Sequence, residues 1–193
     1  MPSRGSIRCK RFFSIREKQP IVDTSRVPAA ILVPIYYREG QYHILFTKRT
    51  RTVKTHKGQI SFPGGVYEDE DGALVNTALR ESTEEIGLAA SDVEILGELD
   101  DTPSVASNYI ISPFVGLIPW PYQFKLNEEE VEEIIEVPIP ALMEKNRLQR
   151  IETLEGKGLS LYFYNYQGRI IWGATARILD QFLNIFAQAM PER

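Results

Sequence analysis

The sequence predicts an α/β domain, because strand-like and helix-like patterns alternate along one chain. Residues 29–37 (AAILVPIYY) form an apolar run of the length of a buried strand, and residues 42–47 follow as a hairpin partner across a turn at residues 39–40. Apolar positions recur at helical spacing over residues 72–86 and again over residues 178–186. Buried strands and amphipathic helices in one chain are typical of a sheet packed against helices.

Length and composition indicate one globular domain. The chain has 193 residues, of which 43% are hydrophobic and 25% charged, ordinary values for a domain with a full core. We assign residues 1–27 to an N-terminal arm and residues 28–190 to a single domain. The arm is locally basic, and we expect a solvated arm or short helix. A transit peptide is the alternative, and the acidic Glu17 and Asp23 count against it.

Net charge, cysteine content and hydropathy exclude several classes of protein. A net charge of −4 argues against a general nucleic-acid binder, so a phosphate-bearing ligand needs local positive charge or a metal. Cys9 is the only cysteine, so no intramolecular disulfide can form, which suits a reducing compartment. No apolar run reaches about 18 residues, and no secretory signal is evident. We therefore expect no membrane partner and a cytoplasmic location.

Three carboxylates gather on one face of the first predicted helix. Glu81, Glu84 and Glu85 lie within an arc of about 100°, because residues three and four apart share a helix face. Like charges at this spacing destabilise an isolated helix, and Arg80 can offset one of them. A divalent cation would turn the repulsion into a binding site, and such oxygen ligands suit Mg²⁺ or Mn²⁺.

The residues before this helix predict a short strand and a glycine turn. Residues 60–62 read as the strand, and Pro63-Gly64-Gly65 as a tight turn whose backbone can approach a ligand closely. Asp71 is the expected N-cap of the helix, and Gly87 is a suitable C′ residue. The inward stripe is Val75, Leu79, Ser82 and Ile86, which leaves the carboxylates on another face.

Residues 65–88 resemble the Nudix box, G-x5-E-x7-R-E-U-x-E-E-x-G-U with U apolar. The matching positions are Gly65, Arg80, Glu81, Glu84, Glu85, Ile86, Gly87 and Leu88. The sequence departs from the box in its Gly65–Arg80 interval, which is one residue longer, and in Ser82, where an apolar residue is usual. Asp71 or Glu70 is the nearest counterpart of the first Glu.

The longer interval is similar to that of the coenzyme A pyrophosphatase branch of the family. One further stretch resembles that branch, residues 45–50 with residues 58–65 (GQISFPGG), while residues 112–116 (SPFVG) and residues 171–175 (IWGAT) resemble segments of the family. The resemblance implies a Nudix fold, with a mixed central β-sheet sandwiched between α-helices. It also implies that the segment of residues 101–116 lines the substrate cleft.

Candidate substrate contacts lie just before the glycine turn. Residues 48–57 are rich in Lys and Arg; on composition alone this is a solvated loop, but beside a metal-phosphate site Arg49 and Arg51 could bind phosphate oxygens. From the resemblance we add Gln59 and Ser61 to the substrate-binding residues.

A fourth candidate carboxylate comes from a second acidic segment. Residues 127–136 (NEEEVEEIIE) read mostly as a solvated charge run before a strand. The resemblance implies that a Glu preceding a Val approaches the metal site from this segment, which singles out Glu130. Glu129 or Glu133 could replace it.

The remaining segments complete the predicted sheet and its cover. We expect strands at residues 93–100 and 109–118, and a short helix at residues 141–145. Residues 159–166 and 169–172 read as a hairpin around Gln167-Gly168, ahead of the last helix.

The function that the resemblance implies is hydrolysis of a nucleoside diphosphate linked to another group. Divalent ions would neutralise the pyrophosphate and lower the pKa of an attacking water. We expect Mg²⁺ or Mn²⁺ held by Glu81 and Glu85, with Glu84 and the Gly65 or Gly64 carbonyl as further ligands. The catalytic candidates are Glu81, Glu84, Glu85 and Glu130, and which of them is the base is left open. Arg80 is expected to orient a Glu.

The branch resemblance implies coenzyme A or a derivative as the small-molecule substrate, cleaved to 3′-phospho-AMP and 4′-phosphopantetheine. An ADP-ribose or dinucleotide pyrophosphatase is the alternative enzyme. A Nudix-like module that senses a nucleotide without cleaving it is the alternative from another class, and the intact Glu81, Glu84 and Glu85 argue against it. The expected assembly is a monomer or a homodimer.

Overall fold

The computed structural model describes residues 10, 13, 16–52, 57–104, 107–143, 148–152 and 160–189. No helix among these residues is both long enough and apolar enough to cross a membrane. Two short 3-10 helices, η1 (Asp69–Asp71) and η2 (Ala90–Asp92), lie on either side of the first long helix. The described strands and α-helices follow in this order: β1 (Val27–Arg38), β2 (Gln41–Arg49), β3 (Ile60–Ser61), β4 (Gly64–Val66), α2 (Leu74–Ile86), β5 (Glu94–Glu98), β6 (Thr102–Pro103), β7 (Tyr109–Leu117), β8 (Val131–Pro138), α3 (Ile139–Met143), β9 (Leu148–Glu152), β10 (Ser160–Tyr166), β11 (Arg169–Trp172) and α4 (Gly173–Ala189).

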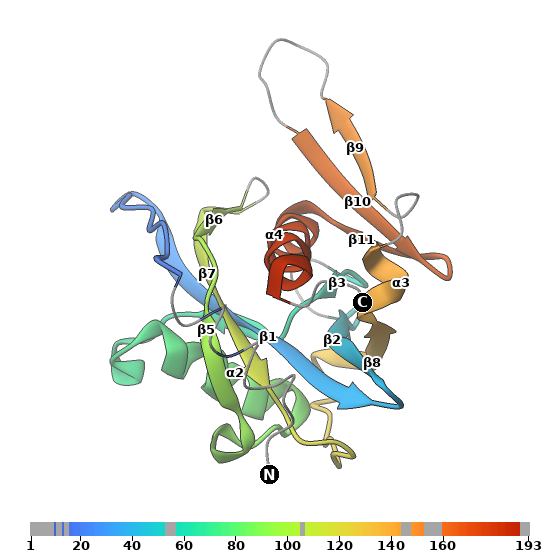
Figure 1. Cartoon of the computed structure of the whole chain (residues 1–193). Coiled ribbons are helices and arrows are strands. Elements are labelled where there is room, and N and C mark those ends of the chain that lie inside the picture. The colour runs from blue at the N-terminus through green and yellow to red at the C-terminus, as the bar shows by residue number, and fades with distance from the viewer. Residues whose placement is uncertain are drawn as a thin grey trace.

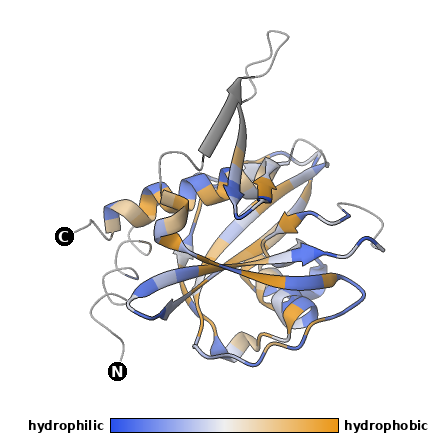
Figure 2. Ribbon diagram, turned by 90° about the vertical axis from the view of Figure 1, so that its right-hand side faces the viewer, coloured by the Kyte–Doolittle hydropathy of each residue, from blue (hydrophilic) through white to orange (hydrophobic). Residues whose placement is uncertain are grey.

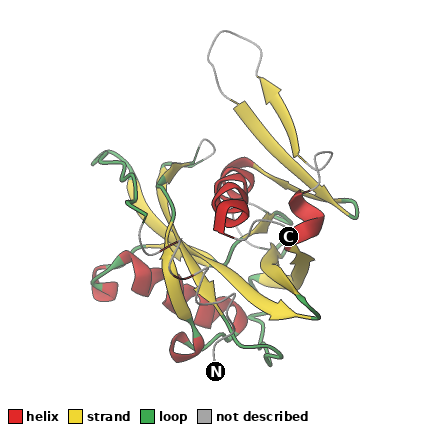
Figure 3. Ribbon diagram, in the orientation of Figure 1, coloured by secondary structure: helices red, strands yellow, loops and turns green. Residues whose placement is uncertain are grey.

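A mixed sheet forms the centre of the molecule (Figure 3). Its main strand order is β3-β2-β1-β7-β5, and β4, β6 and β8 pair with β1, β7 and β2. β1 runs parallel to β7, with Val33 opposite Val115, and antiparallel to β2, with Ile35 opposite Ile44. The predicted hairpin of residues 29–37 and 42–47 is confirmed, and the predicted strands at residues 93–100 and 109–118 correspond to β5 and β7.

Helices cover both faces of this sheet (Figure 1). Successive residues of β1 enter two separate cores, because side chains alternate across a strand. Leu32 packs in a cluster with Ala78 and Ile86 of α2, whereas Val33 belongs to a cluster with Phe182 of α4. Apolar residues concentrate where the strands cross in the middle of the molecule (Figure 2). The predicted sandwich is therefore confirmed, and burial on both faces explains the unbroken apolar run of β1.

A second sheet of three strands precedes the last helix, α4, in the sequence. Its order is β11-β10-β9, and it projects from the main body (Figure 1). The turn between β10 and β11 places Gln167 and Gly168 at positive φ, as a two-residue hairpin turn requires, so this predicted hairpin is confirmed. Because α4 begins at Gly173, directly after β11, the hairpin fixes where the first turn of α4 lies.

The acidic segment after residue 130 forms a strand, so the prediction of a solvated charge run is wrong there. β8 pairs antiparallel with β2, with Ile134 opposite Thr47. Val131, Ile135 and Val137 are buried, so an alternating apolar face exists beneath the charges. The short helix predicted at residues 141–145 begins earlier, as α3 (Ile139–Met143), and residues 144–145 lie outside the described part of the chain.

One described residue of the N-terminal arm, Phe13, packs in the core of the domain, so a solvated arm is wrong for it, whereas Lys10, Glu17 and residues 19–25 are exposed. Phe13 is only 1% exposed and stacks on Phe182 of α4, with 5.9 Å between ring centroids. Lys10 pairs with Glu94, and Lys18 pairs with Asp101 at 2.8 Å. The arm therefore contributes a side chain to the core that covers α4.

We expect Phe13→Ala to lower the free energy of unfolding by about 3–5 kcal/mol, because truncating a buried Phe leaves a cavity. Urea unfolding followed by circular dichroism measures the loss. Lys10→Ala is the matched control, since its pair with Glu94 is exposed and such pairs contribute about 0–1 kcal/mol. Equal losses for the two variants would show that Phe13 is not part of the core.

Candidate active site

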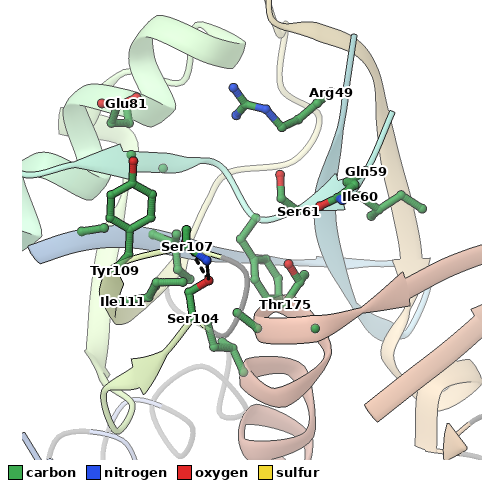
Figure 4. A pocket seen from close by; sticks show the side chains of 18 of the residues that line it. Arg49, Gln59, Ile60, Ser61, Glu81, Ser104, Ser107, Tyr109, Ile111 and Thr175 are labelled. Atoms are coloured by element: carbon green, nitrogen blue, oxygen red, sulfur yellow. Dashed lines mark hydrogen bonds between the residues drawn. The ribbon is translucent and has the colours of Figure 1, made fainter. Parts of the chain in front are cut away.

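A cavity of about 420 Å³ opens where α2, the β3–β4 corner and the first turn of α4 meet (Figure 4). Glu81 enters it from α2, Ser61 from β3 and Thr175 from α4. Glu81 and Thr175 lie on opposite sides of the cavity (Figure 4). Its two ends therefore differ: one end carries charged groups of α2 and β2, and the other is bounded by α4.

Helix α2 presents its carboxylates because backbone signals fix both of its ends. Gly72 takes a left-handed conformation at φ 67° and ends η1, so α2 begins at Leu74 with Ala73 as its N-cap. The prediction that Asp71 is the N-cap is therefore wrong. Gly87 is left-handed at the other end, and its N–H donates to the Thr83 carbonyl, as predicted for a C-terminal glycine.

The inward face of α2 tolerates the unusual Ser82 of the box. Ser82 is fully buried, and its hydroxyl donates to the Ala78 carbonyl at 2.6 Å. A buried hydroxyl that is hydrogen-bonded avoids most of its desolvation cost. Thr77, Ala78 and Ile86 share this buried face, which leaves Glu81 and Glu84 on the outer side.

Arg80 donates hydrogen bonds to several carboxylates near this end of the cavity. Its Nη1 donates to Glu81 Oε1 at 2.9 Å and to Glu84 Oε2 at 3.1 Å, while its Nε donates to Asp71 Oδ1 at 2.8 Å. Its Nη2 also reaches the Val66 carbonyl at 3.2 Å. Arg80 thus contacts more acidic groups than helical spacing alone predicts, because η1 folds Asp71 back onto it.

We expect Asp71→Asn to destabilise the protein by about 1–3 kcal/mol, the cost of leaving charged hydrogen-bonding groups unpaired. Hydrogen bonds from Arg80, together with those from Thr77 and the Glu68 N–H, hold the pKa of Asp71 well below its usual range. A carboxylate whose pKa is lowered by folding stabilises the folded protein at pH values above its unfolded-state pKa. This stabilisation is lost as the pH falls and the carboxylate becomes protonated. The stability difference between wild type and Asp71→Asn, from urea unfolding at several pH values, should therefore shrink below about pH 4. A constant difference would contradict this assignment.

Glu85 is the most deeply buried carboxylate of the site. It is 2% exposed, and Arg49 Nη1 donates to its Oε1 at 3.2 Å. Its Oε2 and the Arg49 Nε are buried and make no hydrogen bond among the described residues. The other end of the Arg49 guanidinium lies 3.8 Å from Glu130 Oε2. Arg49 therefore bridges Glu85 on α2 and Glu130 at the start of β8.

Burial dominates the electrostatics of these carboxylates. The pKa of Glu85 is raised to about 8, chiefly by burial; Arg49 lowers this pKa, and the charges of Glu81 and Glu130 add to the rise. Burial also raises the pKa of Glu81, against the opposing effect of Arg80. Glu81, Glu85 and Glu130 thus repel one another at this end of the cavity, and Arg49 and Arg80 offset only part of that repulsion.

The two glycines before α2 allow close contacts that no other residue permits. Gly64 and Gly65 are not a turn as predicted; they form β4, with Gly65 opposite Ala30 of β1. A Cβ on Gly65 would lie 2.4 Å from the Glu81 carboxylate. A Cβ on Gly64, whose φ is 151°, would lie 2.3 Å from the Ala30 carbonyl oxygen. These glycines let the strand lie directly against the Glu81 carboxylate.

The structure brings most of the predicted site residues together. The cavity is lined by Glu81, Glu85, Glu130, Gly65, Arg49, Gln59 and Ser61. Glu84 and Arg51 are exposed and do not line it. Pro103, Ser104 and Tyr109 do line it, in agreement with the expectation that this part of the chain borders the cleft.

The carboxylates fit a divalent cation in kind and charge. In the described part of the chain, no three His, Cys, Asp or Glu side chains are already gathered as a metal-binding group, because Arg80 and Arg49 hold the carboxylates. A cation would satisfy the buried, unsatisfied Oε2 of Glu85 and offset the remaining repulsion among the carboxylates. Glu81, Glu85 and Glu130 are the side chains best placed to hold it.

Several lining residues were not predicted from the sequence. Trp172 and Arg177 bring β11 and α4 to the cavity wall, together with Thr175 and Ile178. The resemblance of residues 171–175 to a segment of the family is the only sequence signal for this wall. Arg177 follows that segment by two residues and carried no signal of its own.

Comparison with known proteins decides the family. A model of the NUDIX domain matches residues 25–155. The chain belongs to the Nudix family. The uncharacterized Nudix hydrolase NudL of Yersinia enterocolitica is 37% identical over 172 residues, which cover 86% of this chain and 86% of that protein. NudL of Photorhabdus laumondii is 36% identical over 154 residues, covering 79% of this chain and 81% of that protein.

Solved structures share the fold. A MutT/nudix family protein from Enterococcus faecalis gives a TM-score of 0.56 at 12% identity, covering 100% of this chain and 81% of that one. The MutT protein of Methanosarcina mazei gives 0.50 at 19% identity, covering 90% and 95%. The protein is thus a Nudix pyrophosphohydrolase that acts on small nucleoside diphosphate derivatives, and Nudix hydrolases generally use divalent metal ions.

Proposed function

We propose that this Nudix hydrolase cleaves coenzyme A or a derivative into 3′-phospho-AMP and 4′-phosphopantetheine. The proposal is supported by two segments of the sequence that lie side by side in the wall of one cavity. Residues 58–65, which resemble the coenzyme A pyrophosphatase branch, and residues 171–175, which resemble a segment of the family, are far apart in the sequence. Both nevertheless line the cavity that contains Glu81 and Glu85. A substrate that contacts the acidic helix therefore also contacts both segments.

In the proposed mechanism, Glu81, Glu85 and Glu130 would hold Mg²⁺ or Mn²⁺, and the Gly65 or Gly64 carbonyl would be a further ligand. We propose no direct contact with the ion for Glu84, because it is exposed outside the cavity. The bound ion would neutralise phosphate charge and lower the pKa of the attacking water. Glu81, Glu85 or Glu130 accepts the proton of that water. Arg80 orients Glu81 and Glu84 through its hydrogen bonds, and Arg49 is placed to bind a phosphate oxygen once Glu85 takes another partner.

The rest of the cavity would bind the groups attached to the pyrophosphate. Gln59 and Ser61 line it next to Arg49 (Figure 4), and we propose that they contact the substrate. We propose no such contact for Arg51 as it stands, because it is exposed outside the cavity; a role in binding requires its loop to move. The cytoplasm, and a monomer or homodimer, remain our predictions for location and assembly.

The test is a substrate panel with Mg²⁺ or Mn²⁺, in which products are identified by mass spectrometry. The panel contains coenzyme A, an acyl-coenzyme A, ADP-ribose, NADH and a diadenosine polyphosphate. We expect coenzyme A or its acyl derivative to give the highest kcat/KM, and water labelled with ¹⁸O to leave its label on a product phosphate. Efficient cleavage of ADP-ribose with coenzyme A untouched would overturn the proposal in favour of the alternative enzyme.

A further inference from the structure

Arg177 is a half-buried arginine of the cavity lining, and the described residues offer it no acidic partner. It lines the cavity from the first turns of α4, and it makes no ion pair or hydrogen bond with any of the described residues. Every other half-buried arginine in the described ranges is paired with a carboxylate. These are Arg16, Arg26, Arg38, Arg49, Arg80 and Arg169.

An unpaired guanidinium in this position favours an anionic ligand. Partial burial removes some of its hydration, and no carboxylate in the described part of the chain compensates for that loss. Arg49 and Arg80 pair with Glu85, Glu130, Glu81 and Glu84, whereas Arg177 lines the cavity and pairs with none of the described carboxylates. The protein has a net charge of −4, so an arginine without a described acidic partner is a local site of positive charge in the cavity wall.

Arg177 lines the cavity from a different helix than the carboxylates Glu81 and Glu85 of α2. It comes from α4, and Figure 4 shows Thr175 of this helix across the cavity from Glu81 of α2. The Thr175 hydroxyl makes no hydrogen bond among the described residues, so it is a further donor that faces the cavity. A substrate whose pyrophosphate lies at Glu81 and Glu85 would bring a different group to this wall.

We propose that Arg177 binds a phosphate monoester that the substrate carries in addition to the pyrophosphate that is cleaved. A planar guanidinium can donate two parallel hydrogen bonds to phosphate oxygens, and a hydroxyl can add a third. The inference rests on the proposed function, and it narrows the substrates to nucleoside diphosphate derivatives with a further phosphate on the sugar. Arg177 is then the residue that distinguishes them from analogues without that phosphate.

The test uses substrate pairs whose members differ only by one phosphate monoester on the adenosine ribose: coenzyme A with dephospho-coenzyme A, and NADPH with NADH. For the wild type we expect kcat/KM to favour the phosphorylated member by about 10- to 100-fold, the range of one charge-assisted hydrogen-bonded contact. Arg177→Met should abolish that preference by raising KM for the phosphorylated member alone. Arg177→Lys should restore part of it.

Arg169→Met is the matched control, because Arg169 pairs with Glu133 and does not line the cavity. It should leave the preference unchanged. Equal cleavage of both pair members by the wild type, or an equal loss on both in Arg177→Met, would overturn the inference while leaving the pyrophosphatase activity intact.

A binding measurement separates this inference from the proposed function. Calorimetric titration of metal-free protein compares 3′-phospho-AMP with AMP, and we expect tighter binding of the former in wild type but not in Arg177→Met. If none of the four substrates is cleaved, the proposed function fails, and this titration still decides the role of Arg177. Equal affinity for the two nucleotides would then overturn it.

Discussion

Glu85→Gln should lower kcat about 1,000-fold at saturating Mg²⁺ or Mn²⁺ while leaving the fold intact. Glu85 is the one carboxylate of the cavity that is both 2% exposed and left with an unsatisfied buried oxygen. A cation held there loses a buried charge partner in the variant, and such losses cost about 3–5 kcal/mol, or two to four powers of ten. Steady-state kinetics, together with Mn²⁺ titration followed by electron paramagnetic resonance, measures both effects.

Without metal, the same substitution should stabilise the protein at alkaline pH. Burial raises the pKa of Glu85 to about 8, above its ordinary value of 4.5, so the folded state binds more protons than the unfolded state between these values. Wild-type stability must therefore fall as pH rises through this window. Glu85→Gln lacks this titration, so urea unfolding in a chelator should show a weaker decline from pH 5 to pH 8.

Glu84→Gln is the control that shows whether activity depends on the position of the Glu85 carboxylate in the cavity or only on the number of acidic side chains on α2. Glu84 belongs to the same helix and pairs with Arg80, but its side chain is 54% exposed and does not line the cavity. We expect a loss of activity of about tenfold or less, because an exposed ion pair contributes little. A Glu85→Gln enzyme that keeps a tenth of wild-type activity would show that the buried oxygen does not hold the ion.

The fold and the acidic end of the site follow from local patterns. The apolar run of β1 predicts a strand buried on both faces, and four-residue spacing places Glu81 and Glu85 in one cavity. These features depend on residues that are close in the sequence, because the periodicity of a helix or a strand determines which side chains share a face. Gly87 was predictable for the same reason, because the end of a helix requires its left-handed conformation.

The contacts that the sequence could not reveal are those between separate elements. Asp71 binds Arg80 instead of capping α2, because η1 turns the chain before the helix starts. The burial of Val131 within an acidic run depends on pairing with β2. Arg177 reaches the cavity because the β10–β11 hairpin sets the start of α4, and no pattern around Arg177 encodes that position.

Gly65→Ala should reduce activity about 100-fold with a loss of stability of only about 1 kcal/mol. The new Cβ would lie 2.4 Å from the Glu81 carboxylate, which is the flexible end of a side chain and can move aside. Movement is cheap for the fold, but it displaces Glu81 from the cavity and from its 2.9 Å contact with Arg80. A carboxylate displaced by about 1 Å loses catalysis on this scale. Kinetics and urea unfolding on the same preparation measure the two effects.

Gly64→Ala provides the contrast, because its Cβ would meet the Ala30 carbonyl at 2.3 Å and its φ of 151° is one that side chains rarely adopt. Backbone cannot move aside, so this neighbouring substitution should cost several kcal/mol of stability. A double-mutant cycle then tests the cause of the Gly65→Ala defect. If the defect acts through Glu81, adding Gly65→Ala to Glu81→Gln should cost little further activity, since the displaced carboxylate is already gone. Fully additive losses would mean that Gly65 contributes through its own backbone, and the close contact with Glu81 would have no catalytic role.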